Sequence, residues 1–379
     1  MKRKSLTSAE RLDWLRLART SGVGPVSFSK LIERYADAAA ALDALPRLAA
    51  RGGRSKPTRP VTRAQAQAEL DRLDELGARL VCACEPEFPT SLAVLDPPPP
   101  VVSLIGDLDP AERPVCAIVG ARNASAIGIR FAGQLARDLG ERGVIVCSGL
   151  ARGIDGAAHA GSLQSGTIGV IAGGLARVYP PEHAELQAAI ARQGLLVSET
   201  PPDYVAQARD FPRRNRLIAG LSDGVVVIEA AERSGSLITA RMAGEQGREV
   251  MAVPGSPLDP RAKGANRLLR EGAALIESAD DVIAVLSQAR RPSLEEPSGF
   301  DYEDEPPDPR ELEDEADRVR AKVAELLSPS PVSRDEIARL SGAPARAVLA
   351  ALVELELAGR CVLAPNGMVY AAWPDQAGD

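Results

Sequence analysis

The sequence predicts an α/β fold: a mainly parallel sheet covered by helices, with a small helical domain before it and a winged helix after it. Three observations support this prediction. Residues 6–85 follow a helical pattern, and from residue 115 to about residue 287 short apolar runs alternate with helical segments. After residue 317, three helical segments precede a hairpin. We therefore expect domains at 1–95, 96–290 and 318–379.

Composition places the chain among globular proteins. Its 379 residues are 45% hydrophobic, which is enough for two or three cores. No apolar run approaches the roughly 20 residues of a membrane span, and no apolar signal core follows the basic N-terminus, so we expect neither a span nor export. The five cysteines are scattered, which indicates reduced thiols in a cytoplasmic protein and no disulfide frame or zinc site.

The net charge of -7 does not argue against nucleic acid, because the negative charge is concentrated in one segment. Residues 291–317 hold twelve acidic side chains against Arg291 and Arg310. The segment is rich in Pro, Glu and Asp, so we expect a disordered acidic linker there. The charge of the remaining chain is close to balance, and its binding face is not described by the overall charge.

The N-terminal domain contains a possible DNA-binding turn. Ser21-Gly22-Val23-Gly24-Pro25 separates two short amphipathic segments, and this pattern is typical of a helix-hairpin-helix turn, whose backbone amides can hold a DNA phosphate. A helical packing module with no DNA contact explains the same pattern. Both interpretations remain open.

The central region predicts seven strands and at least four helices. Pro97–Pro100 forms a stiff hinge before it. The strands are Val115–Gly120, Val144–Ser148, Thr167–Ala172, Leu195–Ser198, Gly224–Ile228, Val250–Val253 and Ala273–Ile276. The helical segments include Gly128–Glu141, Glu182–Arg192, Leu237–Glu245 and Ala265–Arg270. Such alternation predicts helices on both faces of the sheet.

The C-terminal region predicts a helix at Arg318–Leu327, a second helix opened by the capping box Ser333–Glu336, and a third from Pro344 to Leu357. A hairpin turns at Asn366-Gly367. Residues 318–379 carry seven acidic and seven basic side chains, so DNA and a protein are equally plausible partners for this winged helix.

The stretch Asp210–Gly220 suggests an anion site. Asp210 is the expected N-cap of a helix whose first turns carry Arg213, Arg214 and Arg216. Positive charge is unfavourable at a helix N-terminus, so its accumulation indicates an anion in front of it. Pairing of some of these arginines with acidic neighbours is the alternative.

Arginines, glycines and aromatic residues follow the other strands too. Parallel strands end at the same edge of a sheet, where ligands bind. Arginine grips phosphate, glycine lets backbone amides approach it, and an aromatic ring stacks a base. We therefore predict a nucleic-acid site made of Gly120, Arg122, Ser125, Ser148, Gly149, Arg152, Gly174, Tyr179, Phe211, Arg213, Arg214, Asn215, Arg216, Ser234 and Gly235.

Several of these residues have a structural alternative. The strand-end glycines can be simple tight turns, Ser234–Ser236 can cap a helix, and Tyr179 and Phe211 can be core residues. We expect Asp155 to hold a neighbouring loop. We expect Glu199 and Glu229 to orient arginines and not to act as acid–base catalysts.

Other site classes lack their sequence patterns. The first turn has no G-x-G-x-x-G and the chain has no G-x-x-x-x-G-K-[ST], which argues against a dinucleotide and against a P-loop nucleotide site. His159 and His183 have no metal-ligand neighbour at useful spacing and no partner nucleophile. We expect no metal and no cofactor.

These motifs together resemble the bacterial DNA-processing protein A family, also called Smf. The resemblance covers about residues 100–285 and rests on Ile118–Ser125, Ser148–Asp155 with His159, Tyr179-Pro180, Phe211–Arg216, Ser234–Thr239 and Val253–Gly255. It implies an extended Rossmann core, a homodimer, and binding of single-stranded DNA without catalysis. It also implies protection of incoming DNA and loading of the RecA recombinase in natural transformation.

Carried over by this resemblance, Arg122 and Ser125 contact DNA after the first strand, and Phe211–Arg216 lie on the same pocket. Some relatives carry a basic residue just after Tyr179-Pro180, where this chain has Pro181-Glu182-His183, so a contact there is in doubt. The alternative function is that of a Rossmann-like nucleotide phosphoribohydrolase. Ala240 and Arg241 stand where such an enzyme is expected to carry its carboxylate.

Overall fold

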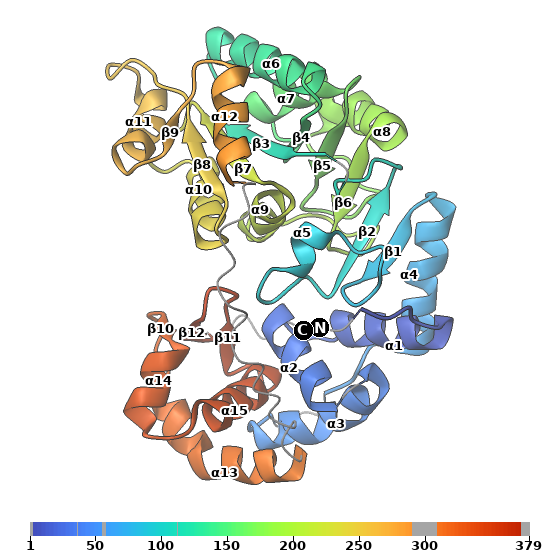
Figure 1. Cartoon of the computed structure of the whole chain (residues 1–379). Coiled ribbons are helices and arrows are strands. Elements are labelled where there is room, and N and C mark those ends of the chain that lie inside the picture. The colour runs from blue at the N-terminus through green and yellow to red at the C-terminus, as the bar shows by residue number, and fades with distance from the viewer. Residues whose placement is uncertain (1–2, 36, 55–57, 112, 290–308, 373–379) are drawn as a thin grey trace.

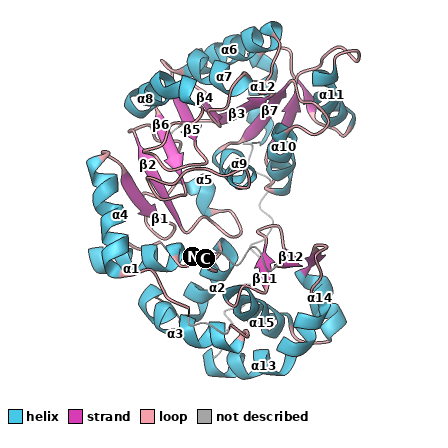
Figure 2. Ribbon diagram, turned by 180° about the vertical axis from the view of Figure 1, so that it is seen from behind, coloured by secondary structure: helices cyan, strands magenta, loops and turns pink. Residues whose placement is uncertain are grey.

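The computed structural model describes residues 3–35, 37–54, 58–111, 113–289 and 309–372. The central sheet and its helices form one part of the molecule (Figure 1). In the other part, the N-terminal helices lie beside the C-terminal domain, as the view from behind also shows (Figure 2). The N-terminal helices and the C-terminal domain, far apart in sequence, therefore pack against each other.

The sheet has nine strands in the order β1-β2-β6-β5-β4-β3-β7-β8-β9. Strand β2 pairs antiparallel with both of its neighbours, β1 and β6. All other neighbouring strands of this sheet pair parallel. The strands are β1 Arg79–Cys82, β2 Val101–Ile105, β3 Val115–Gly120, β4 Ile145–Ser148, β5 Thr167–Val170, β6 Leu195–Ser198, β7 Gly224–Ile228, β8 Glu249–Ala252 and β9 Ala274–Leu275. The predicted mainly parallel sheet is confirmed, and all seven predicted strands are present within about two residues.

Helices cover both faces of the sheet because alternate strand residues point to opposite faces. Cys116 and Ile118 of β3 belong to the apolar cluster under α6, α7 and α12, whereas Ala117 and Val119 belong to the cluster with α9 and α10. The helices of this region are α5 Thr90–Ala93, α6 Ala126–Glu141, α7 Ile154–Ser162, α8 Ala184–Gln193, α9 Asp210–Leu221, α10 Gly235–Glu245, α11 Lys263–Arg270 and α12 Ala279–Ala289.

The N-terminal domain consists of α1 Ser8–Arg19, α2 Pro25–Tyr35, α3 Ala38–Arg51 and α4 Arg63–Glu75. Its core joins that of the sheet. The Trp14 ring packs edge-on to Phe28 at 5.0 Å, and the buried Trp14 indole N–H donates to the carbonyl of Pro100 at 2.8 Å.

The predicted helical pattern over residues 6–85 is wrong at Arg79–Cys82, which forms the edge strand β1. This strand pairs with β2, so the sheet begins before residue 96 in the sequence. A four-residue apolar run after a helix does not separate strand from helix by its period, and only pairing with β2 decides it.

The C-terminal domain has helices α13 Pro309–Leu326, α14 Arg334–Ser341 and α15 Ala345–Leu357 with strands β10 Val332–Ser333, β11 Cys361–Leu363 and β12 Met368–Ala371. The predicted hairpin at Asn366-Gly367 is confirmed. Most of the predicted linker lies outside the described residues, but disorder is wrong for 309–317, which form the first half of α13. Contacts with N-terminal arginines stabilise this acidic stretch, as shown below.

All five cysteines are buried free thiols in this structure. Within the described part of the chain, every helix is too short or too polar to cross a membrane.

Candidate nucleic-acid interface

The strand order places a crevice between β3 and β7. On one side of β3 lie β4, β5 and β6 in sequence order. On its other side lie β7, β8 and β9, so the direction in which the sheet grows reverses at β3. Ligands bind at such switch points, outside the carboxyl ends of the strands. A hollow of about 730 Å³ lies there, and a smaller one of about 150 Å³ adjoins it, sharing Arg122, Tyr179 and Phe211 among its walls. We call the two hollows together the strand-end groove.

A cation and two aromatic rings lie together in this groove. The guanidinium carbon of Arg122 lies 5.1 Å from the centre of the Phe211 ring. The Tyr179 ring is tilted by 54° to Phe211, with 5.3 Å between ring centres, and Tyr179 is 53% exposed. The turn after β3, the loop after β5 and the first turn of α9 therefore supply one stack, which offers ring surface to a base and positive charge to a phosphate. Neither aromatic residue is a core residue.

Arg214 lies beneath the groove and supports it from inside. Its side chain donates to the carbonyl of Gly149 at 2.6 Å and to the carbonyl of Val170, and only 7% of the residue is exposed. Burial lowers the pKa of Arg214 to about 10, and the nearby Asp155 opposes that shift. A Cβ at position 149 would lie 2.6 Å from this guanidinium, so Gly149 is explained by packing.

The loop after β4 is held by Asp155, as predicted. The buried carboxylate accepts from the backbone amides of Gly149 at 3.1 Å and Ala151 at 3.4 Å, and burial raises its pKa. Leu150 and Glu229 have positive φ angles of 55° and 50°, and both follow strands that border the groove. Such backbone strain is common at functional sites.

His159 is a fully buried part of the same support. Its Nε2 accepts from the amide of Leu150 at 3.3 Å, and its Nδ1 lies 2.7 Å from the hydroxyl of Thr167, which itself donates to the carbonyl of Val146. The neutral ring donates through Nδ1, and burial lowers the pKa of His159 to about 3.

This pKa predicts a pH dependence of stability. The unfolded chain takes up the imidazole proton near pH 6.5, whereas the folded chain resists it until about pH 3. The stabilisation is therefore complete above pH 6.5 and falls toward pH 3, by up to about 1.4 kcal/mol per pH unit. We expect His159→Gln to flatten the pH dependence of the urea midpoint between pH 7 and 4. Equal slopes in the wild type and in His159→Gln would contradict the assignment.

Ser125 is engaged by the protein itself. Glu229 accepts from both the amide of Ser125, at 2.7 Å, and its hydroxyl, while the Ser125 oxygen caps α6 by accepting from Gly128 at 2.9 Å. The expectation that Glu229 orients an arginine is wrong: its carboxylate holds the first turn of α6. Ser148 is likewise internal, with its hydroxyl donating to the carbonyl of Ile118.

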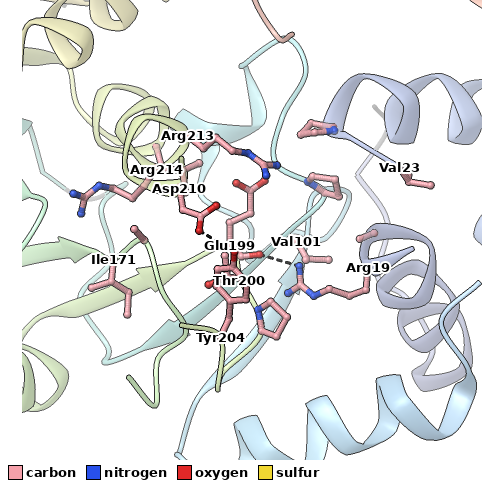
Figure 3. Close-up of a pocket in the computed structure, with 16 residues that line it drawn as sticks. Arg19, Val23, Val101, Ile171, Glu199, Thr200, Tyr204, Asp210, Arg213 and Arg214 are labelled. Carbon is pink, nitrogen blue, oxygen red and sulfur yellow. Dashed lines mark hydrogen bonds between the residues drawn. The ribbon is translucent and has the colours of Figure 1, made fainter. Parts of the chain in front are cut away.

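The arginines of α9 do not converge on one anion. Arg216 pairs with Glu199 and is 7% exposed, which confirms the predicted role of Glu199. The exposed Arg213 lies instead in a separate cavity of about 230 Å³ between the N-terminal domain and the sheet. Figure 3 shows the side chains of Arg213 and Glu199 pointing toward one another, with Arg19 approaching from α1. Successive helical residues point about 100° apart, so adjacent arginines cannot share a direction.

Asp210 is the first residue of α9, not its N-cap, which is Arg209. Its carboxylate accepts from the amide of Gln207 and from the hydroxyl of Tyr204, each at 2.8 Å. The acid therefore orders the preceding loop, and through it the position of Phe211.

The remaining predicted residues either line the groove or are explained by tight packing. Ser234 and Gly235 line the groove, and Asn215 donates to the carbonyl of Gly235 at 3.2 Å. A Cβ at Gly120 would lie 1.9 Å from a backbone carbonyl and one at Gly174 would lie 2.1 Å from two, so both are tight packing positions.

Arg152 lies in the wall but is paired. Glu182 binds its guanidinium on the surface, where the two side chains are 61% and 47% exposed. The pairing raises the pKa of Arg152 and lowers the pKa of Glu182. Sequence reasoning missed Arg177, which also lines the smaller hollow. The sequence feature that could have identified Arg177 is its basic side chain two positions before Tyr179.

Comparisons with known proteins cover all three parts of the chain. The family model described as DNA recombination-mediator protein A matches residues 79–287, a DprA-like N-terminal HHH domain matches 8–71, and a DprA winged helix domain matches 303–367. Protein Smf of Escherichia coli (strain K12) is 37% identical over 310 residues, 81% of each chain. DNA processing protein DprA of Bacillus subtilis (strain 168) is 42% identical over 217 residues, 56% of this chain and 73% of that protein.

Two solved structures share the fold. The X-ray structure of DNA processing protein A from Streptococcus pneumoniae has a TM-score of 0.60 and 33% identity, covering 75% of this chain and 98% of that one. DNA processing protein A from Helicobacter pylori, whose structure concerns its single-stranded DNA binding mode, has a TM-score of 0.51 and 29% identity over 56% of this chain and 96% of that one. The chain belongs to the DNA recombination-mediator protein A family, also named DprA or Smf.

Proposed function

We propose that the chain binds single-stranded DNA in the strand-end groove. The observation that carries this proposal is the stack of Arg122, Phe211 and Tyr179 across the switch point of the sheet. Bases pack on exposed aromatic rings without regard to sequence, and arginine meets the phosphates between them. The single-stranded DNA binding mode described for the Helicobacter pylori relative supports the same ligand.

The groove is suited to binding without bond cleavage. Among its described lining residues Asp155 is the one acidic side chain, and its carboxylate is occupied by backbone amides. The phosphoribohydrolase alternative needs a carboxylate available to a nucleotide. Incubation of the protein with nucleoside monophosphates, followed by chromatography for free base, separates the two functions: released base would overturn the binding proposal.

The direct test of the proposed function is binding of labelled oligo-dT, compared with a blunt duplex, in titrations at several salt concentrations. Affinity for the single strand should fall linearly with salt on a logarithmic plot, with a slope of about -0.7 for each phosphate contact. We expect preference for the single strand and little preference among base sequences. Equal binding of duplex and single strand would contradict a groove built on stacking.

The proposal extends to partners. In the family resemblance, the DNA-bound protein is a homodimer that protects incoming DNA and loads the RecA recombinase in transformation. Sedimentation of the free and DNA-bound chain measures the first property, and nuclease digestion of bound oligo-dT measures protection. Displacement of single-strand binding protein by RecA, with and without the chain, measures loading.

Pairing with Glu182 should limit the contribution of Arg152 to DNA binding. We expect Glu182→Ala to tighten oligo-dT binding by a few fold, up to about fivefold, because an exposed ion pair is worth at most about 1 kcal/mol. The matched control is Glu185→Ala, which removes the same charge one turn further along, where Arg152 is not its partner. The gain should vanish in Glu182→Ala/Arg152→Ala. Equal gains in the two glutamate variants would show only a general charge effect.

A further inference from the structure

The C-terminal domain is docked on the face of the N-terminal domain that carries the predicted helix-hairpin-helix turn. Figure 1 shows α13 and α15 beside α2 and α3. The approach is close: a Cβ added at Gly52, just after α3, would lie 2.0 Å from the backbone oxygen of Glu354 in α15. Arg54 also donates to the carbonyl of Leu357 at 3.0 Å.

A single acidic side chain of α13 is bound by three arginines of the N-terminal domain. Glu313, whose side chain is 3% exposed, lies 2.9 Å from Arg34 and 3.0 Å from Arg51, and it also pairs with Arg47. Three guanidinium groups thus converge on one carboxylate. Such a cluster of guanidinium groups is a typical phosphate site.

The same arginine surface binds further acids of the C-terminal domain. Arg51 lies 2.6 Å from Asp317 and 3.4 Å from the buried Glu354. In these pairs the cations come from α3 and the anions from α13 and α15. The interface is therefore complementary in charge, and it neutralises the N-terminal face with carboxylates.

A fourth acid, Glu356, sits on the helix-hairpin-helix turn. One of its oxygens would lie 3.4 Å from a Cβ at Gly24, directly before α2, and the other accepts from the hydroxyl of Ser27 in the first turn of α2. Burial raises the pKa of Glu356 to about 7, against hydrogen bonds from the Ser27 hydroxyl and the Leu363 amide and against the charge of Arg213. A carboxyl group thus occupies the place where the turn and the helix N-terminus would meet an anion.

We propose that α2, α3 and the turn between Ser21 and Pro25 form a second site for the DNA backbone, and that the winged-helix domain covers it with Glu313 and Glu356 in the place of phosphates. The site lies outside the strand-end groove, so it goes beyond the proposed function and does not depend on it. DNA that displaces the cap gains the arginines and the turn together. The winged helix then acts as a cover that DNA must remove.

The test uses the full chain with Arg122→Ala/Phe211→Ala as its parent, so that binding in the strand-end groove is already weakened. Gly52→Leu removes the docking contact without changing charge, because the new side chain collides with the backbone of α15. Glu313→Lys breaks the same interface by repulsion from Arg34, Arg47 and Arg51. Small-angle scattering reports the release of the domain, and titrations with oligo-dT and with a duplex report DNA binding.

We expect both variants to enlarge the particle and to tighten DNA binding at least about fivefold, with loss of the gain when Arg47→Glu/Arg51→Glu is added. The duplex and oligo-dT titrations show which form of DNA the site takes. Glu325→Lys, an exposed position of α13, controls for the added charge. Release without tighter binding, a particle that does not enlarge, or an equal gain in Glu325→Lys overturns the proposal. Because every comparison is with the parent, failure of the groove assignment leaves this result interpretable.

Discussion

Replacing Arg122 and Phe211 with alanine is expected to weaken oligo-dT binding by about 10- to 100-fold without unfolding the protein. Stacking of one base on an aromatic side chain contributes about 1–3 kcal/mol, and each 1.4 kcal/mol is a tenfold change. Both side chains are at least partly exposed: Arg122 belongs to the turn after β3, and Phe211 is the second residue of α9. Their removal therefore takes away ligand contacts and leaves the core unchanged.

The single variants distinguish the two roles. Phe211→Ala should lower affinity at every salt concentration, whereas Arg122→Ala should also reduce the salt slope by about 0.7, because one phosphate contact is lost. The guanidinium of Arg122 rests on the Phe211 ring, so the two effects should not add fully.

Arg130→Ala is the matched control, an exposed arginine of α6 that lies outside the lining of the groove. Its affinity should stay near that of the wild type. If Arg122→Ala/Phe211→Ala binds oligo-dT as tightly as Arg130→Ala does, the groove is not the binding site.

The sheet was predictable because its signal is local. Each of the strands β3 to β8 is a short apolar run that alternates with helical segments, and this regular alternation identifies them as strands. Strand β1 was missed because it stands outside that alternation, at the end of a helical region, and pairs antiparallel with β2. The first half of α13 was missed because its acidic composition favours disorder in isolation. It is ordered by Arg34, Arg47 and Arg51, more than 250 residues away in the sequence.

The location of the candidate site could be predicted from the sequence, but which side chains are available to a ligand could not. Parallel strands bring their carboxyl ends to one edge, so Arg122, Tyr179 and Phe211 could be placed together from the sequence. The sequence does not show which polar side chain is already occupied. Ser125 is held by Glu229, a residue that follows a strand formed about 100 positions later, and Arg152 is held by Glu182. Residue type predicts affinity for phosphate, but availability depends on tertiary partners.

The adjacent residues Arg213 and Arg214 give the sharpest test of this distinction. Arg214→Ala is expected to destabilise the protein by about 3–5 kcal/mol, because it removes the nearby positive charge that favours the buried Asp155 carboxylate and removes donors from the carbonyls of Gly149 and Val170. For a domain of this size that corresponds to a melting temperature lower by about 6–20 °C. Arg213→Ala, an exposed neighbour in the same helix, should melt within about 2 °C of the wild type.

A double-mutant cycle with Asp155→Asn identifies the cause. Asparagine keeps an oxygen that can accept from the amides of Gly149 and Ala151 but carries no charge. If the main cost of Arg214→Ala is the loss of positive charge near the buried carboxylate, Asp155→Asn/Arg214→Ala should be more stable than the sum of the single changes by about 1–3 kcal/mol. Strict additivity would assign the cost to the lost carbonyl contacts. A melting temperature of Arg214→Ala equal to that of Arg213→Ala would instead show that Arg214 does not support the groove, and would return it to the set of candidate phosphate ligands.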